Sequence, residues 1–488
     1  MRVAETGHFH RILLAPWVVG LIVAAGLGSL FATYWDDAWH TDIGRDDALI
    51  APHLALYGSV AVAGLAVAAW GALVVWRSRS LLAAVRHPAL LTAAAGALVT
   101  LGSGVADAFW HEAFGRDAVL WSPPHMLAVF GTVALIVGVL AGARPGTPSW
   151  LLSAAGGLLL GSALIAVLEF ETDVPQFSEA LYLPVLLVSA LFALGMLRRL
   201  IPGRFAVTRV VGIYVLARLI VAVVLTALGR TAPDLPLAIV GLALADLPWR
   251  RPITAYAAGA AGVSATTLVS AAIGTAGVPV ISVLPAAIPV IALFLAALLA
   301  DSRLRPVAAL LLAGGIAALP MSIPDPALAH DPGQGEPVAQ VLLAGAADGN
   351  GILTLAAELP VACSTSDPCR VLARRAGEVI SGNLSVEGRQ VTGTVRVPTT
   401  GLWFVYLEAA HARGPVETWL ALDASTAQRI SERRDLYLPA GRAEGAALPG
   451  AEIAAGSALY ALGLAVLGLA ILQTRRSRRP ETRIATST

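Results

Sequence analysis

Lysine is absent from this sequence, so arginine fills all 33 of its Lys and Arg positions. Charged residues of both signs are also scarce, at 13% of 488 residues, and the formal net charge is +1. A chain without an excess of positive charge lacks the basic surface that nucleic-acid binding requires, so we expect no nucleic-acid partner. Hydrophobic residues reach 57%. Because a soluble domain does not bury that much apolar surface, we expect the lipid bilayer to be the main partner.

Cysteine and methionine are scarce as well. The two cysteines, Cys363 and Cys369, are too few for a disulfide scaffold or a thiolate metal site. We place them in a segment outside the cytoplasm, where one disulfide is favoured over two free thiols. Four methionines do not make a methionine-rich copper relay. Any metal site in this chain must therefore use other side chains.

Apolar stretches recur along the chain, and each can form a helix across about 30 Å of hydrocarbon. We predict about twelve transmembrane helices, at 12–34, 51–76, 89–110, 125–143, 150–170, 182–197, 208–228, 236–249, 253–275, 281–300, 306–320 and 453–473. The stretch at 236–249 is short, and a re-entrant segment is an alternative there. The fold class that we expect is a mostly α polytopic membrane protein.

The arginines are distributed unevenly over the loops between these helices. Most lie in the loops near residues 2–11, 77–86, 144, 198–204, 250 and 303 and in the basic tail, whereas the opposite loops hold Arg45, Arg116 and Arg230. The positive-inside rule then predicts a multi-pass cell-membrane protein with both termini in the cytoplasm. No signal-peptide cleavage site follows Arg11, so we expect the first helix to be retained.

Residues 321–450 differ in composition from the rest of the chain. Short alternating runs such as "QVTGTVRVP" and "LWFVYLEAA" are separated by turn residues, which is typical of an antiparallel β-sandwich. We therefore expect four regions: 1–148 with four helices, 149–320 with further helices, 321–450 as an extracytoplasmic β domain, and 451–488 as a last helix with a cytoplasmic tail. The two histidines of the β domain, His330 and His411, are expected to be surface residues.

An internal repeat is the most informative feature of the sequence. Residues 36–53 read "DDAWHTDIGRDDALIAPH" and residues 107–125 read "DAFWHEAFGRDAVLWSPPH". The polar positions that match are Asp36/Asp107, His40/His111, Arg45/Arg116, Asp46/Asp117 and His53/His125. Four of the nine histidines thus occupy equivalent places in two consecutive helical hairpins.

The spacing within the repeat predicts two metal sites. Asp36 and His40 are four residues apart and share one helix face, whereas His53 follows a proline that suits the first turn of the returning helix. Asp107, His111 and His125 repeat this arrangement in the second hairpin. Two imidazoles and one carboxylate bind copper, zinc or iron and leave coordination positions open. Solvated helix caps are the alternative, but caps do not require two matching triples.

Each loop of the repeat also carries an Arg-Asp pair. Arg45 with Asp46, and Arg116 with Asp117, are expected either to orient the ligand histidines or to form local surface ion pairs. Two further polar features lie elsewhere. Arg218 lies within an apolar stretch and is expected either to pair internally or to face a polar cavity, with Asp246 as a candidate neighbour. We interpret the carboxylates at 169, 171, 173 and 179 as an acidic outer loop rather than as additional ligands.

The pattern Asp-x3-His-x12-His, with Arg-Asp between the histidines, resembles the copper-binding membrane subunit of the particulate methane and ammonia monooxygenases over residues 10–145. The resemblance implies one copper site at Asp36, His40 and His53 and another at Asp107, His111 and His125. It also implies partner subunits in the membrane, for which a homo-oligomer is the alternative. In that family an Asn begins the second motif, where this chain has Asp107. The added carboxylate favours a harder or more oxidised metal.

Three functions follow as hypotheses. The first is a copper-dependent membrane oxidoreductase, such as a monooxygenase or a subunit of one, that activates oxygen at the outer face. The second is a copper delivery or storage protein. Transport is disfavoured because the matched histidines lie on one side, without ligands continuing through the membrane. The third is a structural scaffold in which metal staples the hairpins.

Overall fold

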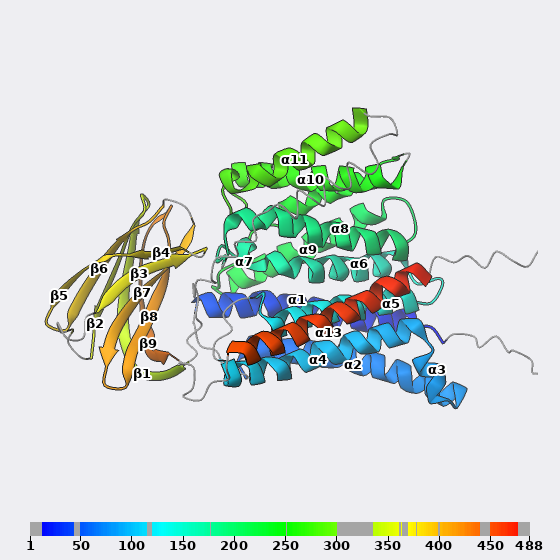
Figure 1. The fold of residues 1–488 in the computed structure, drawn as a ribbon, viewed down its shortest axis with the longest axis horizontal. Coiled ribbons are helices and arrows are strands. Elements are labelled where there is room, and N and C mark those ends of the chain that lie inside the picture. Colours follow the sequence, from blue (N-terminus) through cyan, green and yellow to red (C-terminus); the bar gives the residue numbers. More distant parts are fainter. Residues whose placement is uncertain are drawn as a thin grey trace, which may run out of the picture.

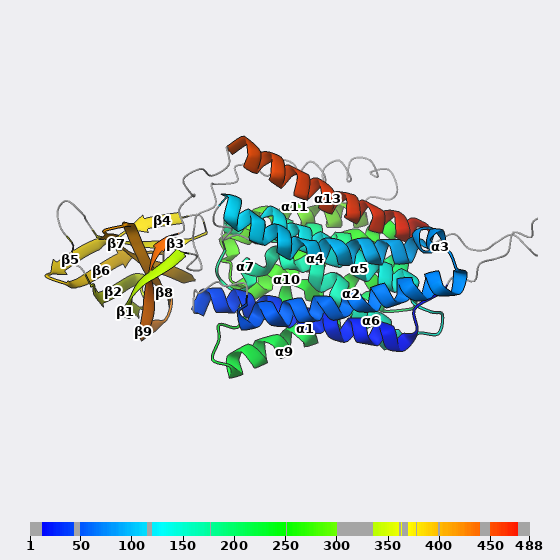
Figure 2. The same cartoon turned by 90° about the horizontal axis from the view of Figure 1, so that it is seen from below.

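The computed structural model describes residues 12–42, 49–114, 120–175, 177–249, 251–299, 335–360, 363, 369–376, 378–398, 401–439 and 449–476. Their helices lie side by side in a bundle, and their strands form one sheet domain at one end of it (Figure 1, Figure 2). Helix α1 begins, and helix α13 ends, at the end of the bundle that is remote from the sheet domain (Figure 1).

The helices of the bundle follow the apolar stretches of the sequence. They are α1 (Pro16–Asp42), α2 (Ala51–Ser78), α3 (Leu81–Val85), α4 (Pro88–Phe114), α5 (Pro123–Gly142), α6 (Ser149–Leu164), η1 (Ile165–Val167), α7 (Leu168–Glu171), η2 (Glu179–Leu181), α8 (Tyr182–Leu200), α9 (Ala206–Ala227), η3 (Leu237–Asp246), α10 (Pro252–Ala272), α11 (Val280–Leu299) and α13 (Pro449–Arg476). Several begin at a proline, whose fixed φ suits the first helical turn.

Nine helical segments in the described part of the chain are long and apolar enough to cross a membrane. The mostly helical class is confirmed, and the nine apolar helices are compatible with a multi-pass membrane protein, but a count of twelve is not confirmed. The stretch at 236–249 contains a 3-10 helix of ten residues, η3, which spans only about 20 Å at a rise of about 2.0 Å per residue. Helix α11 is 20 residues long and contains Pro285 and Pro289, and its side chains are described as far as Phe294. The predicted helix at 306–320 lies outside the described residues.

Glycines allow the helices of the second hairpin to approach closely. A Cβ atom at Gly96 of α4 would lie 2.3 Å from the backbone nitrogen of Leu135 in α5. A Cβ atom at Gly138 of α5 would lie 2.3 Å from the backbone nitrogen of Ala93 in α4. Because small residues are what permits such backbone contact in membranes, α4 and α5 form a tight pair. This pairing fixes the relative height of the two helix ends that carry the second motif.

The sheet domain is antiparallel, as the alternation predicted. Its strands are β1 (Gly335–Asp348), β2 (Ile352–Glu358), β3 (Arg370–Arg375), β4 (Glu378–Ser381), β5 (Asn383–Glu387), β6 (Gln390–Arg396), β7 (Leu402–His411), β8 (Gly414–Asp423) and β9 (Ala427–Pro439). They form one sheet in the order β4-β3-β7-β8-β9-β1-β2-β6-β5. Along β6, buried and exposed residues alternate strictly.

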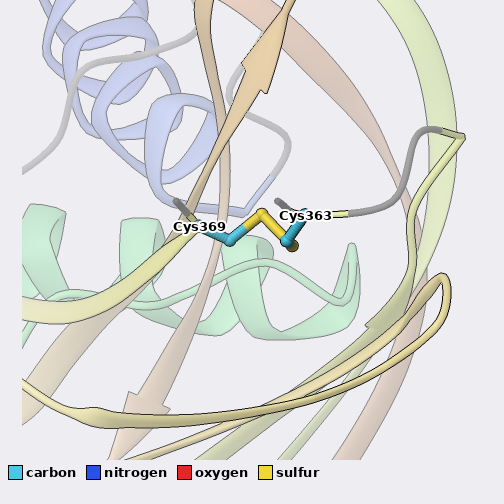
Figure 3. Close-up of a disulfide and its surroundings, with 2 residues drawn as sticks. All are labelled: Cys363 and Cys369. Carbon is cyan, nitrogen blue, oxygen red and sulfur yellow. A yellow bond between two sulfur atoms is a disulfide. The ribbon is translucent and has the colours of Figure 1, made fainter. Parts of the chain in front are cut away.

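The two ends of this sheet fold over a common apolar core. Strands β3 and β6 are distant in the sheet order, yet a Cβ atom at Gly393 of β6 would come within 2.6 Å of Val371 in β3. Leu343, Leu353 and Leu420 are fully or almost fully buried in the same cluster. Cys363 and Cys369 are joined by a disulfide beside this core, so the predicted pairing is confirmed (Figure 3).

The sheet domain is attached to the bundle through one buried arginine. Arg375, at the end of β3, is 5% exposed. Its Nη2 donates to Asp173 Oδ1 at 2.7 Å, to Glu179 Oε1 at 3.1 Å and to the carbonyl oxygen of Gly277 at 3.1 Å. The other oxygen of Asp173 accepts from the backbone nitrogen of Leu402 at 2.7 Å. Charge-assisted bonds of this kind are among the stronger ones in proteins.

An apolar contact accompanies this ion pair. Val174 of the bundle is 2% exposed and packs in a cluster with side chains of the sheet domain, namely Leu372, Phe404, Tyr406, Trp419 and Tyr437. The backbone nitrogen of Ala376 also donates to the carbonyl oxygen of Pro175 at 2.8 Å. The segment after α7 is therefore the docking segment for the sheet domain.

Replacing Arg375 tests this attachment. We expect Arg375→Met to lower the free energy of unfolding by about 1–3 kcal/mol, because it leaves buried acceptors without their donor. Amide hydrogen exchange should rise at Asp173 and Val174 and at the start of β7. The control is Arg389→Met, which removes an exposed ion pair with Glu358 inside the sheet domain. Unchanged exchange at Asp173 and Val174 in Arg375→Met would contradict the assigned docking.

Candidate metal centre

The first repeat is carried by the hairpin of α1 and α2. Asp36 and His40 lie on one face in the last two turns of α1, and His53 lies in the first turn of α2, directly after the buried Pro52. Gly28 in α1 lies against Ser59 in α2, since a Cβ atom at Gly28 would be 2.7 Å from Ser59 Oγ. The close pairing of the helices brings the exit of one and the entry of the other to the same level.

The three predicted ligands of this first site converge. His53 Nε2 lies 3.1 Å from Asp36 Oδ1, and His40 Nε2 lies 3.9 Å from the same oxygen. One donor atom from each of the three residues can be chosen so that all lie within 4.8 Å of one another. Their side chains are 16–22% exposed, so the cluster is half-buried at the helix ends.

This geometry fits a metal ion. Ligand atoms at about 2.0–2.2 Å from a shared ion lie roughly 3–4 Å apart, which matches the separations of both imidazoles from Asp36. The rings of His40 and His53 are nearly perpendicular, at 82°, with centroids 6.2 Å apart. Two imidazole nitrogens and a carboxylate oxygen suit copper, zinc or iron(II). The donor set therefore does not by itself select the metal.

The second repeat is partly visible in the structure. His125 Nε2 lies 3.3 Å from Asp107 Oδ1, with the two side chains 38% and 30% exposed. Ser122 caps α5, and its hydroxyl accepts from the backbone nitrogen of His125 at 3.4 Å. His111 belongs to the last turns of α4, but its side chain lies outside the described residues. Two of the three predicted ligands are thus brought together, and the third stays a prediction.

The Arg-Asp pairs of the two loops cannot be placed. Arg45, Asp46, Arg116 and Asp117 all lie outside the described residues. Their role as orienting groups or as surface ion pairs remains a prediction from the sequence.

A buried polar cluster adjoins the first site. Arg218 of α9 is 1% exposed and donates from Nη1 to Glu171 Oε2 at 2.5 Å and to the hydroxyl of Tyr214 at 2.9 Å. The hydroxyl of Tyr34, two residues before Asp36, donates to the same Glu171 oxygen at 3.3 Å. The Arg218 guanidinium also lies 4.1 Å from the centroid of the Tyr34 ring. This cluster ties the end of α1 to α7 and α9.

Arg218 pairs internally, as expected, but its partner is Glu171. The candidate Asp246 is not its partner, since Asp246 Oδ2 accepts from the backbone nitrogen and the hydroxyl of Thr208 at 2.7 and 2.9 Å. Nor do the carboxylates form an exposed acidic loop. Glu169 and Glu171 are each 4% exposed, and Glu169 Oε1 accepts from the backbone nitrogen of Leu120 at 2.7 Å.

The polar cluster continues into the segment between α9 and η3. Arg218 Nη2 donates to the carbonyl oxygen of Asp234 at 3.0 Å, and the backbone nitrogen of Asp234 donates to the carbonyl oxygen of Glu171 at 2.7 Å. Burial, together with the nearby carboxylates of Asp173 and Glu171, raises the pKa of Asp234 to about 7. Sequence reasoning did not find this residue, because nothing in the local pattern shows that it lies against Glu171.

No protein-family model matches the chain, and no curated protein and no solved structure matches it. The function of the site therefore rests on its own donors and surroundings.

The ion pair between Arg218 and Glu171 makes a stability prediction. Arg218→Met should lower the free energy of unfolding by about 3–5 kcal/mol, because it leaves a buried carboxylate without its counter-charge. The double variant Arg218→Met/Glu171→Leu should recover most of this loss, since it removes both charges. Thermal unfolding in nanodiscs measures both. If Arg218→Met were as stable as Arg218→Met/Glu171→Leu, the two side chains would not be energetically coupled.

Proposed function

We propose that this chain is a copper-binding multi-pass membrane protein that works as an oxidoreductase or as a subunit of one. The observation that carries the proposal is the convergence of Asp36, His40 and His53 at the end of the first helical hairpin. The ion would bind His40 Nε2, His53 Nε2 and Asp36 Oδ1, since these atoms already face one another. A second ion would bind Asp107 and His125, with His111 as the third ligand.

Copper is favoured by the resemblance of the duplicated motif to the copper-binding membrane subunit of the particulate methane and ammonia monooxygenases. A bound copper ion supplies one-electron redox chemistry and open coordination positions for oxygen. The chain's own contribution is to hold the ligands. Tyr34 is hydrogen-bonded to Glu171, which fixes the last turns of α1 that carry Asp36 and His40. Tyr57 lies beside the His53 ring, with centroids 5.8 Å apart.

We place the sites and the sheet domain on the extracytoplasmic side of the cell membrane. The arginine distribution supports this orientation. The arrangement of the helices is compatible with it, since the start of α1 and the end of α13 lie at the same end of the bundle, away from the sheet domain (Figure 1). A disulfide in the sheet domain also suits an oxidising compartment.

Metal content tests the proposal. The protein purified in nanodiscs and loaded with copper should hold about two ions per chain by elemental analysis, one for each Asp/His/His set. His40→Ala/His53→Ala and His111→Ala/His125→Ala should each lose about one ion. The control is His411→Ala, which removes a histidine of the sheet domain and should leave the copper content unchanged. A wild type that holds no more copper than the two double variants would contradict the proposal.

Oxygen uptake separates catalysis from metal handling. The copper-loaded wild type, given an electron donor and candidate small substrates, should consume oxygen faster than the His40→Ala/His53→Ala variant. Stoichiometric copper without any oxygen uptake, alone or with partner subunits present, would instead support delivery or storage. Loss of stability in the histidine variants without any bound metal would support a structural scaffold.

A further inference from the structure

A cleft of about 690 Å³ opens where the sheet domain meets the bundle. On the bundle side it is lined by the last residues of α1, Thr41 and Asp42, and by Arg230 after α9. On the sheet side it is lined by β1, β8 and β9, with Arg433 and Arg434 among the lining residues. The cleft begins one residue after His40, but it shares no residue with the three metal ligands.

The cleft exists because β8 and β9 separate. These strands follow one another in the sequence, yet one registered pair, Glu417 with Tyr437, joins them in the described part of the chain. Strand β9 is instead paired along its length with β1. The edge of β9 from residue 428 to residue 435 therefore faces the cleft rather than β8.

The carboxylates of the cleft are already engaged. Both oxygens of Asp42 accept from Thr231, from its backbone nitrogen at 2.8 Å and its hydroxyl at 2.5 Å. Asp435 Oδ1 accepts from Gln340 Nε2 at 2.9 Å. Glu432 Oε2 lies 3.1 Å from Arg434 Nη2. Each of the three carboxylates thus has a partner within the protein, and the Glu432 side chain is 46% exposed.

The arginines are less completely matched. Arg434 is the least available of the three, since its side chain is 10% exposed, its Nη2 faces Glu432 and its Nε is a buried atom. The Arg230 guanidinium lies 5.6 Å from the centroid of the Trp39 ring, and no ion pair joins it to any residue that the structure describes. Arg433 is exposed and likewise has no carboxylate partner among the described residues. The cleft thus presents guanidinium donors that its own acids do not satisfy.

We propose that this cleft binds a phosphate-bearing anion. Guanidinium groups bind the oxygens of phosphate through paired, charge-assisted hydrogen bonds. Arg230 approaches the anion from the bundle and Arg433 from the sheet domain, so the anion bridges the two parts of the protein. The phosphate belongs either to a lipid headgroup, since the cleft lies at the end of the bundle, or to a soluble molecule. The proposal does not depend on the metal site.

Binding measurements on the full chain test this site. Inorganic phosphate is titrated into detergent-purified protein by calorimetry, and phosphatidylglycerol retention is measured by native mass spectrometry from nanodiscs against phosphatidylcholine. We expect Arg230→Gln/Arg433→Gln to weaken binding at least about tenfold, or about 1.4 kcal/mol, because the variant removes charge-assisted hydrogen bonds from both sides of the cleft. The affinity of Arg433→Lys should lie between those of this variant and the wild type, because lysine keeps the positive charge but lacks the paired donors of the planar guanidinium.

The matched control is Arg370→Gln/Arg396→Gln. It removes the same charge from exposed positions on β3 and β6 that do not line the cleft. If Arg230→Gln/Arg433→Gln loses phosphatidylglycerol binding alone, the site is assigned to a lipid. If it loses inorganic phosphate binding alone, the site is assigned to a soluble anion. Equal weakening in the control, or no weakening of either probe in Arg230→Gln/Arg433→Gln, overturns the proposal. Melting temperatures without ligand confirm that the variants are folded.

Discussion

The ion pair between Arg218 and Glu171 is the interaction on which the rest of the arrangement depends. A guanidinium inside a helical bundle is tolerated only when its charge and its donors are matched. Glu171 supplies the opposite charge, and the hydroxyl of Tyr214 and the carbonyl oxygen of Asp234 accept further hydrogen bonds from the guanidinium. Glu171 also accepts from Tyr34. One carboxylate therefore sets the positions of α1, α7 and α9 relative to one another.

Two consequences extend from this pair in opposite directions along the chain. Tyr34 lies two residues before Asp36, so its hydrogen bond holds the turn of α1 from which the first metal site is built. Asp173 lies two residues after Glu171 and receives Arg375 of the sheet domain. The proposed metal centre, the domain junction and the arginine-lined cleft all lie at this end of the bundle. A change at Glu171 is expected to disturb all three.

Much of this site was predictable from the sequence, because its information is local. The helical spacing of Asp36 and His40 and the proline before His53 were enough to predict that the three side chains converge. Alternation along 390–396 and 402–411 predicted antiparallel strands, and the composition predicted a membrane protein. The disulfide between Cys363 and Cys369 followed from their number and from the expected compartment.

The errors concern contacts between distant segments. The partner of Arg218 could not be read from the sequence, since Glu171 is 47 positions away and periodicity does not show which helix faces align. Asp246 was equally plausible until Thr208 was seen to engage it. The stretch at 236–249 is not a spanning α-helix, and the sequence did not show this because hydropathy does not distinguish a ten-residue 3-10 helix from one. The role of Arg375 could not be predicted from the sequence, because its partners in the bundle are known only once the sheet domain is docked.

The most direct test of the central claim is X-ray absorption spectroscopy of the copper-loaded protein in which His111→Ala/His125→Ala has removed the second motif. We predict one copper per chain with two imidazole ligands and one oxygen ligand from the protein, at about 2.0 Å. His53→Ala added to this background should reduce the imidazole contribution by one. A spectrum without imidazole scattering, or one that His53→Ala leaves unchanged, would contradict the claim that Asp36, His40 and His53 form a metal site.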